Sequence, residues 1–190
     1  MRLILGSASP RRAELLTAAG FSFDVRVADV DERVRAGERP DAYVRRLAME
    51  KSAAVLAATA DSIAGVVVIG ADTAVIVGDE ILGKPIDDAD AERMLRQLSG
   101  RSHLVLTGIS VRSSRRDLTD VDETRVFVRE LTDAEVAWYV ASGEGRDKAG
   151  GYAIQGLASR FIPRIEGSYA NVVGLPVAKA AELIERLAME

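Results

Sequence analysis

The chain has 190 residues, of which 48% are hydrophobic and 28% charged, as in an ordinary globular protein. It contains no cysteine, which excludes disulfides, thiolate catalysis and thiolate metal sites. The net charge is −4, and acidic and basic residues are interspersed. This argues against a nucleic-acid polymer as partner, because duplex binders carry a basic face. A local positive cluster would still suffice for a small phosphate-bearing ligand.

No segment predicts a membrane partner. The longest apolar stretch, from Ile63 to Val77, is interrupted by a Gly-Ala-Asp-Thr run, and the apolar run at the start is too short for a signal peptide. We therefore expect a cytoplasmic protein, and the lack of cysteine suits a reducing compartment. The length predicts one domain over residues 1–190, with room for two lobes whose boundary the sequence does not mark.

Apolar strands and amphipathic helices are expected from the start of the chain. Ser9 followed by Pro10 is typical of a helix start, and Gly20 of a helix end. Asp41 is the expected cap of a long Ala-rich helix that ends at about Ala60. The elements expected in this half are strands at 2–6, 21–27, 65–69 and 73–77, helices at 10–20 and 41–60, and a hairpin arm at 80–82.

The second half continues the same interleaving. Asp88 is the expected cap of a helix that ends before Gly100, and Thr132 with Glu135 forms a capping-box motif. The expected elements are helices at 88–98, 132–142 and 177–187, strands at 103–111, 120–128 and 161–165, and a glycine-rich loop at 144–156. Strands and helices do not alternate strictly, which predicts an α/β fold with a mixed sheet flanked by helices.

The first strand-to-helix junction combines two serines with two arginines. The first turn of a helix offers unpaired N–H groups and a positive dipole end, and both favour an anion. Ser7 and Ser9 can donate hydroxyl hydrogen bonds there. Arg11 and Arg12 oppose the dipole at a cost of about a few tenths of a kcal/mol, which an acidic ligand would offset. Read alone, the segment is slightly more typical of a Ser-Pro cap with two solvated arginines.

Asp72 lies between two apolar segments, so its carboxylate is expected to be buried. A carboxylate near phosphates could hold a divalent cation or accept a proton from water. An aspartate at a strand end that binds its own backbone is the common alternative. Asp31 and Glu32 form a second acidic pair, in a segment more typical of a solvated loop.

Three further polar side chains could contact a ligand, although each also has an ordinary structural explanation. Lys84, between a glycine and a proline, could neutralise a phosphate or simply be an exposed turn lysine. Lys51 lies near the apolar face of its helix, where a lysine more often covers the core with its stem and keeps its tip in water. Gln155 could read a base edge or belong to a flexible loop. His103, the only histidine, is more typical of a structural residue than of a catalytic one.

Six motifs, taken together and in order, resemble one family. They are SxSPRRxELL (Ser7–Leu16), GADT (Gly70–Thr73), GKP (Gly83–Pro85), LSGRSH (Leu98–His103), DKAGGYAIQG (Asp147–Gly156) and GSYxNVVGLP (Gly167–Pro176). They resemble the Maf family of nucleotide pyrophosphatases, and the resemblance runs from the first strand to the last helix. It implies an α/β fold similar to that of the inosine triphosphate pyrophosphatases, with two lobes around a cleft.

The resemblance also implies chemistry. Members hydrolyse a nucleoside triphosphate between its α and β phosphates, use a divalent cation such as Mg²⁺ or Mn²⁺, and are often homodimers. Asp72 would be the general base or a metal-side carboxylate, and Glu32 would assist at the metal. The groups that would bind the phosphates are Arg12, Lys51 and Lys84.

The resemblance finally implies a substrate class. Arg11, Thr73 and Gln155 would sit where the family sets base preference, and members with this set resemble the dTTP/UTP pyrophosphatases. The expected substrates are dTTP, UTP and related or modified pyrimidine nucleotides, hydrolysed to monophosphate and pyrophosphate, with removal of noncanonical nucleotides as one use. The alternatives are CTP or 7-methyl-GTP as target, a nucleotide-binding regulator of septum formation without turnover, and, more distantly, a nucleic-acid binder.

Overall fold

The computed structural model describes residues 1–59 and 65–189, and the chain divides into two compact units. The first unit comprises Met1–Thr73, Thr107–Asp122 and Gly174–Glu190, and the second comprises Ala74–Leu106 and Glu123–Val173. Three of the four points where the chain passes from one unit to the other fall inside long strands. These strands are β3 (Val66–Val77), β5 (Ser102–Arg112) and β6 (Asp117–Phe127).

The strands are hydrogen-bonded in the order β2-β1-β3-β5-β6-β7, with β4 paired to β3. The short members are β1 (Arg2–Gly6), β2 (Asp24–Val25), β4 (Glu80–Leu82) and β7 (Arg164–Glu166). Strand β1 runs parallel to β2 and β3, whereas β4 and β7 run antiparallel to β3 and β6. The expected mixed sheet of an α/β fold is therefore confirmed.

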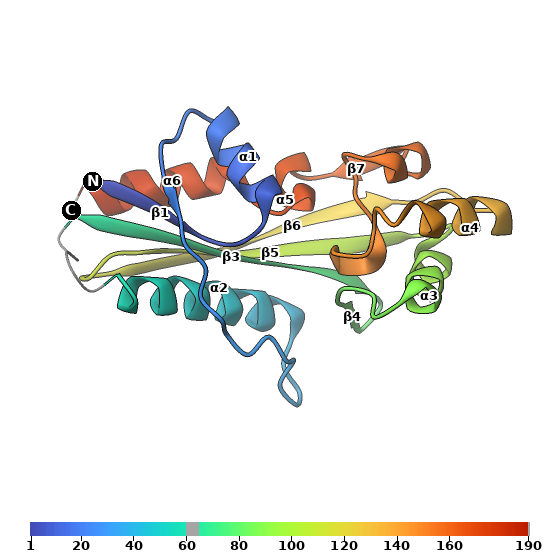
Figure 1. Cartoon of the computed structure of the whole chain (residues 1–190), viewed down its shortest axis with the longest axis horizontal. Helices are drawn as coiled ribbons and strands as arrows, with labels where there is room; N and C mark the ends of the chain where they lie inside the picture. Colours follow the sequence, from blue (N-terminus) through green and yellow to red (C-terminus); the bar gives the residue numbers. More distant parts are fainter. Residues whose placement is uncertain (60–64, 190) are drawn as a thin grey trace. The chain divides into compact units, whose positions relative to one another are not determined.

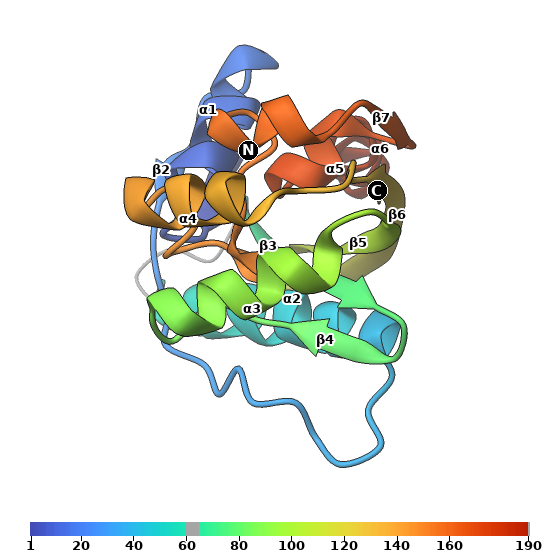
Figure 2. The same cartoon turned by 90° about the vertical axis from the view of Figure 1, so that its right-hand side faces the viewer.

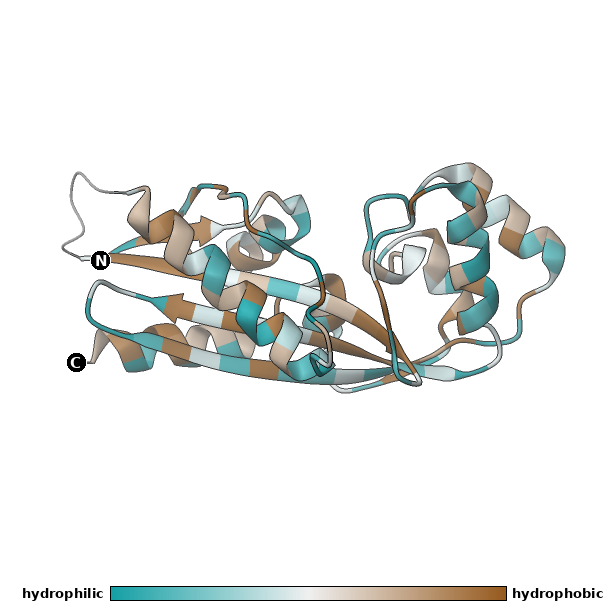
Figure 3. Cartoon of the chain, turned by 90° about the horizontal axis from the view of Figure 1, so that it is seen from below, coloured by the Kyte–Doolittle hydropathy of each residue, from teal (hydrophilic) through white to brown (hydrophobic). Residues whose placement is uncertain are grey.

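Helices cover both faces of the sheet in the first unit (Figure 1). Helices α1 (Pro10–Ala18) and α6 (Val177–Ala188) lie on one face, and α2 (Pro40–Ala57) lies on the other. The strand that leaves the N-terminus is mostly brown in Figure 3, at the hydrophobic end of the scale. Its Leu5 packs with Leu16, Ile69 and Leu183 in a buried cluster that fixes α1 and α6 on the strands.

Two glycines let α2 approach the strands beneath it unusually closely. A Cβ built on Gly70 would lie 2.2 Å from the Ala48 carbonyl oxygen, and one on Gly108 would lie 2.3 Å from that of Val44. Both neighbours are helix backbone, so neither can turn aside as a side chain could. The distance of α2 from the sheet, and so the position of the side chains on α2, depends on these two glycines.

The Gly108→Ala variant is expected to lose about 1–3 kcal/mol of stability, because the added methyl group must displace α2 from β5. Chemical denaturation measures the change. Gly83→Ala is the control, since a Cβ there meets nothing within 4 Å in the part of the chain that the structure describes. Equal stabilities of the two variants would contradict the close approach as the reason for Gly108.

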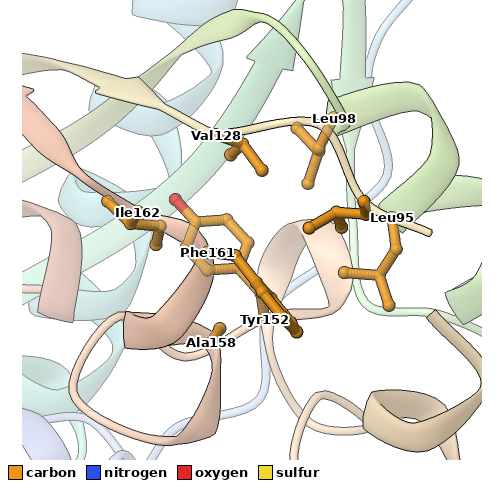
Figure 4. A pocket seen from close by; sticks show the side chains of 8 residues that line it. Leu95, Leu98, Val128, Tyr152, Ala158, Phe161 and Ile162 are labelled. Carbon is orange, nitrogen blue, oxygen red and sulfur yellow. The ribbon is translucent and has the colours of Figure 1, made fainter. Parts of the chain in front are cut away.

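The second unit packs short helices around its own core. Its helices are α3 (Asp88–Leu98), α4 (Asp133–Ser142) and α5 (Tyr169–Val173), with 3₁₀ turns η1 (Ala149–Gly151) and η2 (Leu157–Phe161). Helices α3 and α4 contact each other (Figure 2). Eight hydrophobic side chains line a small pocket there (Figure 4): Leu95, Leu98, Val128, Leu131, Tyr152, Ala158, Phe161 and Ile162. It is a gap in an apolar core, with no charged group in its lining.

Several expected boundaries need correction. The long helix begins at Pro40 after Arg39, so Asp41 lies in the first turn and is not the cap. The cap of α3 is Asp87, whose carboxylate accepts from the Asp90 amide, and not Asp88. The expected helix end at Ala60 lies outside the described residues. The capping box of Thr132 and Glu135 is confirmed.

The strand predictions were less accurate than the helix predictions. The two strands expected at 65–69 and 73–77 are the single strand β3, which continues through the polar GADT run. The strands expected at 21–27 and 161–165 shrink to Asp24–Val25 and Arg164–Glu166, and residues 157–161 form the 3₁₀ turn η2. Helix α5 was not expected. None of the helices in residues 1–59 and 65–189 is long and apolar enough to cross a membrane.

Candidate active site

The turn between β1 and α1 is organised by Ser7. Pro10 occupies the first helical position as expected, but the Ser9 side chain makes no capping hydrogen bond. Instead the Ser9 amide donates to Ser7 Oγ at 3.2 Å. Ser7 is buried, whereas Ser9 and Arg11 are half-buried. The junction therefore directs one serine hydroxyl inward, toward Arg12.

Arg12 is buried and held by neutral oxygen atoms. Its Nε donates to the Gly174 carbonyl at 2.8 Å, its Nη1 to Ser7 Oγ at 3.0 Å and its Nη2 to Thr73 Oγ1 at 3.1 Å. Only 9% of the residue is exposed. No carboxylate forms an ion pair with Arg12 within residues 1–59 and 65–189. Burial lowers the pKa of its guanidinium, because the charge is poorly solvated there, and the nearby charges of Asp72 and Glu32 oppose this shift. The expectation of a solvated arginine at this position is wrong.

Asp72 and Glu32 both bind the same lysine. Lys51 Nζ lies 2.7 Å from Asp72 Oδ1 and 2.6 Å from Glu32 Oε1. The Lys51 and Asp72 side chains are 13% and 11% exposed, whereas that of Glu32 is 54% exposed. Lys51 therefore turns its tip to a buried carboxylate, and the expectation of a wet tip is wrong. Burial raises the pKa of Asp72, and the nearby charges of Lys51 and Arg12 oppose this shift.

Asp72 and Thr73, which are neighbours on β3, connect the Lys51 ion pairs with the hydrogen bonds of Arg12. Asp72 accepts from Lys51, while the hydroxyl of the next residue, Thr73, accepts from Arg12. The first unit thus brings together six of the sequence-predicted residues: Ser7, Arg12, Glu32, Lys51, Asp72 and Thr73. A buried carboxylate, an ammonium and a guanidinium with no carboxylate partner are groups that could bind a polyanion and accept a proton.

The fit of this site to a divalent cation rests on its two carboxylates. No three His, Cys, Asp or Glu side chains come together as a metal-binding group among the described residues. Asp72 and Glu32 converge on the Lys51 ammonium, so two hard oxygen donors already face one positive charge. Mg²⁺ is commonly held by one or two carboxylates, with substrate phosphates and water as its other ligands. This pair fits that pattern.

Two sequence-predicted residues, Lys84 and Gln155, belong to the second unit. Lys84 is exposed on the turn after β4, and Gln155 is exposed in the glycine-rich loop. The Gly150 amide donates to the Gly83 carbonyl at 2.9 Å, which ties that loop to the turn beside Lys84. Gly150 has φ +70°, and a Cβ there would lie 2.9 Å from Val75 Cγ1. A glycine is therefore required for this contact.

His103 has a structural environment. The residue is 2% exposed, and its Nε2 lies 2.8 Å from the Tyr152 hydroxyl. Its Nδ1 has no hydrogen-bond partner within the described residues. Burial lowers the pKa of His103 from 6.5 to about 4, because the imidazolium would be poorly solvated there.

Stability should therefore decline in acid as His103 protonates. The unfolded chain takes up a proton near pH 6.5 and the folded chain only near pH 4, so stability is full above pH 6.5 and falls below it. The expected loss by pH 4 is about 3 kcal/mol. Urea unfolding across this range measures it, and His103→Gln should show a shallower decline. Identical slopes for the two proteins would refute the assignment.

The fold and this site define an α/β protein with a buried carboxylate beside cationic groups suited to phosphates. The model of the family described as Maf-like protein matches residues 2–187, and the chain belongs to that family. Relatives named dTTP/UTP pyrophosphatase include those of Anaeromyxobacter dehalogenans (strain 2CP-C; 52% identical, 97% of this chain and 93% of the relative) and Hahella chejuensis (46% identical, 100% and 94%). The solved structure of the Staphylococcus aureus Ham1 protein aligns at 19% identity, over 70% of this chain and 73% of that chain, with a TM-score of 0.46.

Proposed function

We propose that this protein hydrolyses nucleoside triphosphates, dTTP and UTP among them, to the nucleoside monophosphate and pyrophosphate. Near-full-length relatives carry that activity in their names. The structural observation that carries the proposal is Asp72, a buried carboxylate whose pKa is raised, close to a buried guanidinium without a carboxylate partner. A carboxylate that can accept a proton and a cation without an ion-pair partner both favour the attack of water on a phosphoanhydride.

The reaction needs charge neutralisation and a proton acceptor. A triphosphate carries about four negative charges near neutral pH. Arg12, Lys51 and Lys84 supply three positive charges for it. Asp72 accepts a proton from the attacking water as the oxygen–phosphorus bond forms at the α phosphate. The bond from that phosphorus to the bridging oxygen breaks, and pyrophosphate leaves with the electron pair.

A divalent cation, Mg²⁺ or Mn²⁺, completes the proposal. Asp72 and Glu32 would hold it, since these carboxylates converge on one positive charge already. When bound, it supplies further neutralisation of the phosphates. The cation would then compete with the Lys51 ammonium for the Asp72 and Glu32 carboxylates. The ammonium would become available to a phosphate oxygen.

We propose that Arg11, Thr73 and Gln155 set the base preference, as the resemblance of the sequence motifs implies. The Thr73 hydroxyl accepts a hydrogen bond from Arg12, a proposed phosphate-binding residue. Thr73 would therefore affect phosphate binding as well as base preference. We further propose a cytoplasmic homodimer in which residues 1–190 form one domain of two units, acting on canonical or modified pyrimidine nucleotides. Neither nucleic-acid polymers nor membranes are among the proposed partners.

A panel of canonical and modified nucleoside triphosphates, with Mg²⁺ or Mn²⁺ and read by pyrophosphate release, tests the proposal. Release from dTTP and UTP that stops when the metal is chelated is the expected result. Release of inorganic phosphate in place of pyrophosphate would move the cleavage to another bond. Tight nucleotide binding without any release would favour the alternative, a nucleotide-binding regulator of septum formation.

A further inference from the structure

Arg12 is positioned without the carboxylate that usually holds a buried arginine. Its three hydrogen bonds go to a carbonyl and two hydroxyls, all of them neutral. Neutral acceptors fix the plane of the guanidinium and leave its charge available to an anion. The orientation of the Arg12 guanidinium therefore depends on how firmly each of the three acceptors is itself held in place.

Thr73 Oγ1 is the acceptor that depends most on a further residue. It lies 3.0 Å from Thr107 Oγ1, and it can also donate to the Gly174 carbonyl at 3.3 Å. That carbonyl already accepts the Arg12 Nε proton at 2.8 Å. Whichever threonine donates, the bond between the two hydroxyls fixes the rotamer of Thr73, and so the lone pair that faces Arg12 Nη2.

Thr107 itself cannot easily move. It is fully buried on β5, the neighbour of β3 in the sheet, so its hydroxyl is presented from a packed strand. It lies outside the six motifs that resemble the family. We propose that Thr107 is a positioning residue that acts through Thr73 to hold the Arg12 guanidinium on the substrate phosphates. This inference rests on the proposed function.

Two substitutions at one position separate the hydroxyl from the shape of the side chain. Thr107→Val keeps the shape and removes the hydroxyl, whereas Thr107→Ser keeps the hydroxyl. Thr107→Val is expected to lower kcat/KM for UTP by about fivefold, mainly through KM, which is the effect of one lost hydrogen bond. Thr107→Ser should stay within about twofold of the wild type. An equal loss in both variants would overturn the proposal, because the role would then be steric.

The matched control is Thr59→Val, an isosteric change at another buried threonine of the first unit. Thr59 Oγ1 bonds only to Val55 and Arg26 among the described residues. Thermal unfolding is recorded for all variants. A kcat/KM loss in Thr59→Val equal to that in Thr107→Val would overturn the proposal, since buried hydroxyl loss alone would then explain it.

A double-mutant cycle with Arg12→Lys tests whether Thr107 acts through the guanidinium. In that background Thr107→Val should have no further effect on kcat/KM, because there is no guanidinium left to position. Full additivity of the two changes would overturn the inference. A wild type without turnover would instead overturn the proposed function. Binding of inorganic triphosphate would then decide the inference: weaker binding by Thr107→Val supports it, and equal binding refutes it.

Discussion

Asp72→Asn is expected to lower kcat for pyrophosphate release by about 10²–10⁴, the usual contribution of a general acid or base. Asparagine has the size of aspartate but cannot take a proton from water. Steady-state release from UTP with saturating Mg²⁺ measures the effect. Asp120→Asn is the matched control, since Asp120 is a carboxylate of the same unit that also pairs with a lysine, Lys179.

Loss of the fold is not expected to explain the loss of activity in Asp72→Asn. Burial raises the pKa of Asp72 in the folded state above its pKa in the unfolded chain. The ionised carboxylate therefore lowers the stability of the fold at any pH above the unfolded-state pKa. Removing that charge should leave the unfolding temperature of the metal-free protein equal to or above that of the wild type. A variant that is stable and still turns over at a near-native rate would refute the general-base assignment.

Local sequence signals predicted helix ends well. They located β1 and β4 correctly but divided β3 and extended β2 too far. The capping box at Thr132 and Glu135 acts within four residues, so the sequence alone locates the start of α4. Strand β3 was divided at its polar GADT run, because a carboxylate in an apolar strand is costly in isolation. The pairing of Asp72 with Lys51, 21 residues away in the sequence, offsets part of that cost within the continuous strand.

The same limit applies to the site. The motifs identified Asp72 and the cationic residues. Residue spacing alone, however, predicted that the Lys51 stem covers the core and that its ammonium is exposed to water. Its partners come from a loop before α2 and a strand after it. Thr107 had no signal at all, because its partner lies on a neighbouring strand and its own segment is ordinary apolar sequence. Residues that act through tertiary pairs cannot be located by a reading of one segment at a time.

The unit boundary escaped prediction for a related reason. A boundary is normally recognised by a polar or flexible linker. Here the chain changes unit inside β3, β5 and β6, which continue through the crossings as strands of 11 or 12 residues. The fourth change falls between Val173 and Gly174. A strand that continues through the crossing lacks the linker by which a boundary is recognised.

Lys51→Met is expected to separate metal binding from turnover. In the structure the Lys51 ammonium lies against both Asp72 and Glu32, which are the proposed metal carboxylates. A cation that binds these oxygens must displace it or tolerate its charge. Without the ammonium, Mn²⁺ should bind the nucleotide-free protein about tenfold more tightly, whereas turnover should fall about 100-fold because a phosphate-binding cation is lost.

Isothermal titration with Mn²⁺ and pyrophosphate release from UTP give the two readouts. Lys179→Met is the matched control, because Lys179 Nζ also lies between two carboxylates, 3.1 Å from Asp120 and 3.4 Å from Asp122. It should leave turnover unchanged. Adding Asp72→Asn to Lys51→Met should abolish the gain in Mn²⁺ affinity, which identifies the carboxylate responsible. Unchanged or weaker Mn²⁺ binding by Lys51→Met would mean that lysine and metal do not compete, and that the cation is held by other groups.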